Sequence, residues 1–139
     1  MVCCEAMTAD MEKRRAGARE ILLEAGGRAL PRWPWQHPKE APVDEVLVRF
    51  ALSRAMDQRQ PIRQEELEAG LALVDAARCD LDALETALVF AARAEGMTWG
   101  QVAQAMGLRS PQAAQQRFQR TSDRPRDTAT DASSGAARA

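Results

Sequence analysis

The chain has 139 residues, of which 45% are hydrophobic and 28% are charged, so it is long enough for one domain with flexible ends. Its formal net charge is −1, so overall charge gives no sign of a nucleic-acid partner, and only a local excess of basic residues can do so. No apolar run approaches the roughly 18 residues of a membrane span, and we expect no membrane partner.

The cysteines and the N-terminus predict a cytoplasmic protein. Cys3, Cys4 and Cys79 are an odd set without the spacing of a disulfide framework. The first residues lack a basic segment followed by an apolar core, which is the pattern of a signal peptide. We therefore expect a reducing cytoplasmic environment.

Residues 1–42 are predicted to contain one helix, over residues 9–25, preceded by a loose segment over residues 1–8. Gly26 and Gly27 end that helix. A basic cluster within it is either a solvated helix face or a second contact to phosphate. The cluster consists of Lys13, Arg14, Arg15 and Arg19.

The second part of this region, residues 31–42, reads PRWPWQHPKEAP and holds four prolines. It cannot continue a helix, so an extended segment is predicted. Trp33 and Trp35 are costly to leave exposed. We expect them to pack over the helical core, and the alternative is that they anchor a protein partner.

Two further helices are predicted, over residues 43–58 and 62–95. The second is long, and its apolar residues recur at intervals that average close to the 3.5 residues of a coiled coil. This stripe predicts a homodimer through the long helix or through the helix at 43–58, and the alternative is a bundle core within one chain. The stripe consists of Leu67, Leu71, Val74, Ala77, Leu81, Leu84, Leu88 and Ala91, whereas Leu73, Val89 and Phe90 form a second apolar side.

Residues 98–120 predict a helix-turn-helix. Thr98 is a good N-cap, and Gln101 stands at the capping-box spacing. Trp99, Val102 and Met106 share one face of the helix that follows. Gly107 comes after the last apolar residue, where a left-handed backbone is usual, and Leu108 is placed to fill the gap between the two helices.

The second helix of the pair begins at Ser110, a strong N-cap, with Pro111 at the first helical position. Ala114 and Phe118, four residues apart, form its buried side. The outward side is long, polar and free of acids. It carries Gln112, Gln116, Gln119 and Arg120, with Ala113 beside them.

Those residue types suit the major groove of double-stranded DNA, because Gln pairs with adenine and Arg with guanine or phosphate. We expect Gln112, Ala113, Gln116 and Arg120 to read bases. The residues expected at DNA phosphates are Thr98, Gln101, Arg109, Ser110 and Arg117.

Local charge supports this interpretation. Residues 97–126 hold five Arg and one acid, whereas residues 40–95 hold twelve acids and six Arg. The alternative is a helical hairpin whose polar face is merely solvated.

The run LETALVFAARAEGMTWGQVAQAMGLRSPQAAQQRF, within residues 81–118, resembles small actinobacterial helix-turn-helix proteins. Some of these are labelled transcriptional regulators of a small heat-shock protein. The resemblance rests on four short motifs: AARA-x-G, the T-W opening, A-x-x-x-G and QAA-x-x-RF. The run also resembles, more loosely, the DNA-binding helices of sigma-factor region four. It implies a DNA-binding role for Gln112, Ala113, Gln116 and Arg117. Pro111 stands where such proteins often carry Arg, so one of their DNA contacts has no equivalent here.

Catalytic and metal-binding patterns are not evident. His37 is the single histidine, and Cys3, Cys4 and His37 lack a fourth ligand and the spacing of a zinc module. We see no phosphate-binding glycine loop and no GxSxG motif. Asp80, Asp82 and Glu85 are expected to be a solvated patch or a patch at a helix N-terminus rather than catalysts. We therefore expect neither an enzyme nor a cofactor.

The sequence as a whole predicts an all-α fold, a small helical bundle with a long central helix and a C-terminal helix-turn-helix. Residues 43–120 would form the core, and residues 121–139 a disordered tail whose Arg124 and Arg126 approach DNA phosphates. The expected function is a dimeric, sequence-specific transcription regulator in the bacterial cytoplasm, associated with the nucleoid. The alternatives are a helical adaptor or sigma-like module that binds proteins, and a non-specific nucleoid protein.

Overall fold

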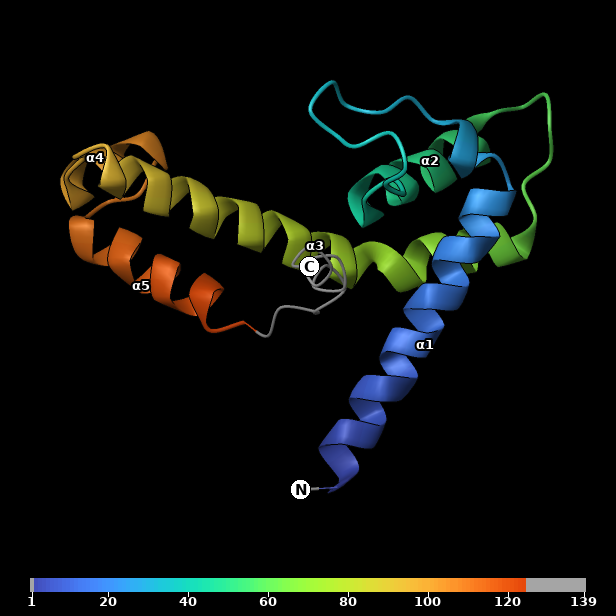
Figure 1. Cartoon of the computed structure of the whole chain (residues 1–139), viewed down its shortest axis with the longest axis horizontal. Coiled ribbons are helices and arrows are strands. Elements are labelled where there is room, and N and C mark those ends of the chain that lie inside the picture. Colours follow the sequence, from blue (N-terminus) through green and yellow to red (C-terminus); the bar gives the residue numbers. More distant parts are fainter. Residues whose placement is uncertain (1, 125–139) are drawn as a thin grey trace, which may run out of the picture. The chain divides into compact units, whose positions relative to one another are not determined.

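The computed structural model describes residues 2–124, with side chains from residue 7 onward, and every regular element in that part of the chain is helical. Its helices are α1 (Val2–Glu24), the short 3-10 helix η1 (Gly27–Ala29), α2 (Asp44–Met56), α3 (Gln64–Ala94), α4 (Trp99–Ala105) and α5 (Pro111–Ser122) (Figure 1). This confirms the predicted all-α class with a long central helix. The chain divides into two compact units, Met1–Asp80 and Leu81–Ala139, and α3 contributes residues to both.

The ends of two helices differ from the prediction. α1 begins at Val2 rather than at residue 9, because residues 2–8 contain no Gly or Pro, the two residues that interrupt helices most strongly. α5 extends to Ser122, two residues beyond its predicted end. The tail that we expected to be disordered lies, for residues 125–139 and with it Arg126, outside the described residues.

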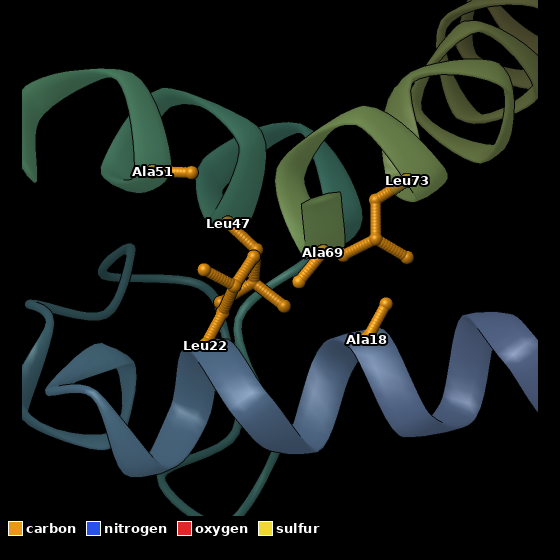
Figure 2. Packing of buried hydrophobic residues seen from close by; sticks show 6 residues of the cluster. All are labelled: Ala18, Leu22, Leu47, Ala51, Ala69 and Leu73. Carbon is orange, nitrogen blue, oxygen red and sulfur yellow. The ribbon is translucent and has the colours of Figure 1, made fainter. Parts of the chain in front are cut away.

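The core of the first unit lies where α1, α2 and the first part of α3 meet. Leu22, Leu47 and Leu73, one from each helix, are fully buried, and each contributes about 1.5–3 kcal/mol through the burial of its side chain. Figure 2 shows Leu22 and Leu47 in contact between α1 and α2, and Leu73 pointing toward Ala18. Small residues complete this core and let the helices approach closely; they are Ala18, Ala51 and Ala69.

Two positions on α3 fix its packing on α2. A Cβ at Gly70 would lie 2.8 Å from the Cβ of Ala51, so the helices approach here more closely than any larger residue permits. Glu66 is completely buried. It accepts hydrogen bonds from the backbone N–H of Arg63 at 2.9 Å and from Arg54 Nη2 at 3.1 Å, so the start of α3 is tied to the last turn of α2.

Two residues of the basic cluster of α1 hold the first unit together. Arg15 is buried and pairs with Asp75 at 3.4 Å. Arg19 donates two hydrogen bonds to Asp44, at 2.7 and 2.9 Å. Both proposed roles for the cluster, a solvated face and a phosphate contact, are therefore wrong for these two arginines. Arg14, by contrast, is exposed.

Trp33 and Trp35 do not pack over the helical core, and that expectation is wrong. Their side chains are 54% and 81% exposed. The two rings stack on each other, with centroids 5.5 Å apart and planes only 4° from parallel. Leucines and alanines already fill the space between the helices, so each tryptophan ring shields one face of the other instead.

The stripe of α3 is mostly solvent-facing. Its leucines are all exposed; they are Leu67, Leu71, Leu81, Leu84 and Leu88. The packing inside the two units comes from the second apolar side, through the buried Leu73 and Val89. Phe90, which we had placed on that second side, is 69% exposed instead. α3 is one uninterrupted helix from Gln64 to Ala94, as predicted.

Candidate nucleic-acid interface

Backbone geometry at Gly96 ends α3 and directs the chain into α4. The φ of Gly96 is 91°, a region in which glycine is the favoured residue. The N–H of Met97 donates to the carbonyl of Ala92 at 3.0 Å, and the N–H of Gly96 donates to that of Arg93 at 3.1 Å. This is the Schellman pattern of a helix C-terminus.

The start of α4 is the predicted capping box. The N–H of Gln101 donates to Thr98 Oγ1 at 3.1 Å, and the N–H of Thr98 donates to Gln101 Oε1 at 2.8 Å. Both side chains thereby satisfy backbone donors that have no partner inside the helix. Both hydrogen bonds of the predicted capping box are therefore present.

Gly107 forms the turn between α4 and α5, as predicted. Its φ is 68°. The N–H of Leu108 donates to the carbonyl of Ala103 at 2.8 Å, and the N–H of Gly107 donates to that of Gln104 at 3.1 Å, which repeats the Schellman pattern. Ser110 then caps α5 by accepting a hydrogen bond from the N–H of Ala113 at 3.1 Å, with Pro111 in the first turn.

A small apolar cluster holds α4 and α5 against the second part of α3. Its buried members are Val89, Val102, Ala103 and Ala114, and the partly buried side chains around them include Met97, Met106 and Leu108. The rings of Trp99 and Phe118 meet at 5.8 Å between centroids. The guanidinium of Arg93 lies 5.1 Å from the centre of the Trp99 ring, in a cation–π contact. The predicted inner side of α5, Ala114 and Phe118, is therefore confirmed.

The opposite side of α5 is an exposed polar surface, which we call the α5 face. It consists of Gln112, Gln116, Gln119 and Arg120, all exposed, with the half-buried Ala113 at its edge. No acidic residue interrupts it between Pro111 and Ser122. The expected base-reading residues are thus gathered on one side of one helix.

The arginines near this face fall into two groups. Arg117 donates two hydrogen bonds to Glu85 of α3, from Nε at 2.6 Å and from Nη2 at 2.7 Å. These bonds raise the pKa of Arg117 further above its ordinary value. Arg124 pairs with Asp82. For Arg109 and Arg120, both exposed, the described part of the chain offers no ion-pair partner.

Asp82 and Glu85 were expected to form a solvated patch, and this is wrong, because both carboxylates are partly buried and bonded to arginines of the C-terminal segment. A further bond connects the same elements, from Thr86 Oγ1 to Thr121 Oγ1 at 2.8 Å. Sequence reasoning did not single out Thr86, and it gave Asp82 and Glu85 no contact with the C-terminal arginines. The one available signal was their spacing, since positions 82, 85 and 86 lie on one side of a helix.

Four of the residues expected at phosphates, all except Arg117, lie near the N-termini of α4 and α5. A Cβ at Gly100 would lie 3.7 Å from Thr98 Oγ1 and 3.9 Å from Pro111 Cγ, so the two N-terminal turns are adjacent. Thr98, Gln101 and Ser110 already bond to backbone groups of their own helices. Arg109 is the exposed cation at this end.

No family model matches the chain, and neither curated proteins nor solved structures include one significantly similar to it. Within residues 2–124, no helix combines the length and apolarity that crossing a membrane requires. The side chains described there include no group of three or more His, Cys, Asp or Glu placed to hold a metal ion.

Proposed function

We propose that the chain is a sequence-specific DNA-binding transcription regulator that inserts α5 into the major groove. The observation that carries this proposal is the α5 face, a row of exposed glutamines and Arg120 without an acid. Glutamine pairs with adenine through two hydrogen bonds, and arginine does so with guanine. The capped turn at Gly107 and the apolar cluster behind Ala114 hold this row outward.

Within this proposal, Gln112, Ala113, Gln116 and Arg120 contact base edges. Arg109 and the adjacent N-terminal turns, with Thr98, Gln101 and Ser110, contact phosphates and orient the helix. Arg117 can contact a phosphate only if it first breaks its hydrogen bonds to Glu85. A dimer would place two α5 helices at half-sites about 34 Å apart. The resemblance of residues 81–118 to small helix-turn-helix regulators supports the same function, in the cytoplasm and at the nucleoid, with no catalytic role.

The test is selection of bound duplexes from a random DNA pool, followed by titration of the selected duplex and of an unrelated one. The variant Gln112→Ala/Gln116→Ala should bind the selected duplex more weakly, by about 1–3 kcal/mol per lost base pairing, with little change for the unrelated duplex. The matched control is Gln58→Ala, which removes an exposed glutamine from the loop between α2 and α3.

A second candidate function is a protein-binding adaptor, which the exposed Trp33–Trp35 stack favours. It predicts a protein partner that is lost on Trp35→Ala, and no salt-sensitive retention on DNA. Equal affinity for unrelated duplexes would instead indicate a non-specific nucleoid protein. Either result overturns the regulator proposal.

A further inference from the structure

The outward side of α3 in the second unit is a continuous apolar surface. Leu81, Leu84 and Leu88 are 51%, 59% and 70% exposed, and the exposed Ala87 and Ala91 lie beside them on the same side of the helix. The charged residues of the same stretch lie on the other side, where Asp82 and Glu85 bond to arginines and Arg93 covers Trp99. From Leu81 to Ala94, therefore, the outward side presents no charged side chain to water.

We infer that a second copy of this chain packs on this surface, along a line formed by Leu81, Leu84, Leu88 and Ala91, which we call the α3 line. Its members are separated by three, four and three residues, the spacing of the core positions in a coiled coil. The dimer is part of the proposed function, but its interface is argued from α3 alone.

The two copies of α3 run antiparallel in this dimer. The spacing of the α3 line reads the same from either end, so a twofold axis brings Leu84 against Leu88 of the second copy and Leu81 against its Ala91. Large side chains then meet small ones at both ends of the line. Antiparallel helices also place opposite ends of their macrodipoles together.

The position of Glu95 favours the antiparallel orientation of the two α3 helices over the parallel one. Glu95 follows Ala91 by four residues and so continues the α3 line. In a parallel pair, the two Glu95 carboxylates would lie side by side at the edge of an apolar contact, where like charges repel. The antiparallel pair moves them to opposite ends.

Other occupants fit this surface poorly. Residues 125–139 offer only Ala and one Pro as apolar side chains, so that segment has nothing to fill the spaces between leucines. The α4–α5 hairpin packs on the other side of α3, through Val89 and Thr86, so the α5 face stays open in the dimer. The α3 line is a short contact of four residues, so we expect a weak dimer with a dissociation constant on the order of micromolar.

The test is sedimentation velocity of the full chain without DNA, from low micromolar to submillimolar concentration. The wild type should show a monomer–dimer equilibrium, and Leu84→Glu/Leu88→Glu should raise the dissociation constant at least about tenfold. The matched control is Leu52→Glu on α2, because Leu52 is exposed to a similar extent, 61%. This variant should leave the monomer–dimer equilibrium unchanged. A wild type that stays monomeric, or a double variant that still dimerises, overturns the inference.

A second measurement does not depend on the folding of the glutamate variant. Leu84→Cys and Leu88→Cys are made separately in chains whose three native cysteines are replaced by alanine, then mixed and oxidised. The antiparallel dimer should give mainly the mixed disulfide between the two variants. Disulfides formed only within each variant would overturn the orientation. Because no DNA is present, failure here leaves the DNA-binding proposal standing, and failure to bind DNA leaves the dimer standing.

Discussion

Arg117 and Glu85 are joined by two parallel hydrogen bonds, Nε to Oε1 at 2.6 Å and Nη2 to Oε2 at 2.7 Å. The pair connects the middle of α5 to α3 across 32 residues of sequence. Both bonds are charge-assisted, and the planar guanidinium matches the carboxylate in geometry. A phosphate that approaches Arg117 must therefore compete with an internal anion for the same donors.

This relationship predicts that Glu85→Gln binds DNA more tightly than the wild type. The change removes a negative charge beside the α5 face and releases Arg117 to a phosphate. One additional phosphate contact should steepen the slope of log K against log salt concentration by about 0.9. The measurement is fluorescence anisotropy of a labelled duplex at several salt concentrations. The free energy of unfolding should fall by no more than about 1 kcal/mol, because the pair is partly exposed.

The control for this variant is Glu40→Gln, which makes the same charge change at an exposed residue of the first unit. It should leave the salt slope unchanged. If both variants gain affinity equally, the effect comes from net charge and not from the release of Arg117. An unchanged slope in Glu85→Gln would show that Arg117 does not reach phosphate.

The local structure of the candidate site could be predicted from sequence because its determinants are neighbours in the chain. The capping box of Thr98 and Gln101, the left-handed Gly107 and the Ser110 cap each depend on residues within one helical turn. The identity of the inner side of α5 followed equally from the four-residue spacing of Ala114 and Phe118.

Charge was harder to predict, because counting along the sequence says nothing about which charges meet in space. Residues 97–126 contain five arginines and only one acidic residue. In the structure, two of them meet Asp82 and Glu85, which lie in the acidic stretch of the sequence. Arg126 lies outside the described residues. Up to residue 124, the exposed basic surface therefore depends mainly on Arg109 and Arg120.

The packing of α3 was also beyond sequence reasoning, because the helix has two apolar sides. Periodicity shows which residues share a side, but it does not show which side is covered by the same chain. The regular leucine spacing predicted a homodimer contact, with a bundle core within one chain as the alternative. Leu73 and Val89 of the less regular set are buried within the units, whereas the leucines of the stripe remain exposed.

Two substitutions at Ser110 should separate folding from DNA binding. Ser110→Ala removes the acceptor for the Ala113 N–H, so the free energy of unfolding should fall by about 1 kcal/mol. Ser110→Asp keeps an acceptor and adds a charge that suits a helix N-terminus, so stability should be retained. DNA affinity should nevertheless drop in Ser110→Asp, because its carboxylate repels phosphate. Urea denaturation and DNA titration of both variants check this, and undiminished affinity in Ser110→Asp would place Ser110 away from phosphate.

Gly107 should be intolerant of a side chain for reasons of backbone conformation alone. A Cβ at this position meets no atom within 4 Å, but its φ of 68° is costly for an L-residue. We expect Gly107→Ala to lower the free energy of unfolding by about 1 kcal/mol. The control is Gly17→Ala in α1, where a Cβ also meets nothing and φ is not positive. That variant should gain up to about 1 kcal/mol, so thermal denaturation should show shifts of opposite sign.

Glu66 should make the stability of the first unit depend on pH. The hydrogen bond from the backbone N–H of Arg63 lowers the pKa of this buried carboxyl, the bonds from Arg54 lower it further, and burial opposes both. A carboxyl whose pKa is depressed in the folded state stabilises that state above its ordinary pKa of about 4.5. That contribution is lost as the pH falls through the lower folded value.

We therefore expect Glu66→Gln to be less stable than the wild type at pH 7, by about 1–3 kcal/mol, because Arg54 and the Arg63 N–H lose a charged acceptor. The difference should shrink steadily as the pH falls below about 4.5, because the unfolded wild type takes up a proton there and the folded carboxyl follows only at its lower pKa. Urea denaturation across this pH range gives the measurement. Glu65→Gln is the control, because Glu65 is exposed and should show little change at any pH. A difference between wild type and Glu66→Gln that stays constant down to pH 2 would show that the charge of Glu66 does not stabilise the fold.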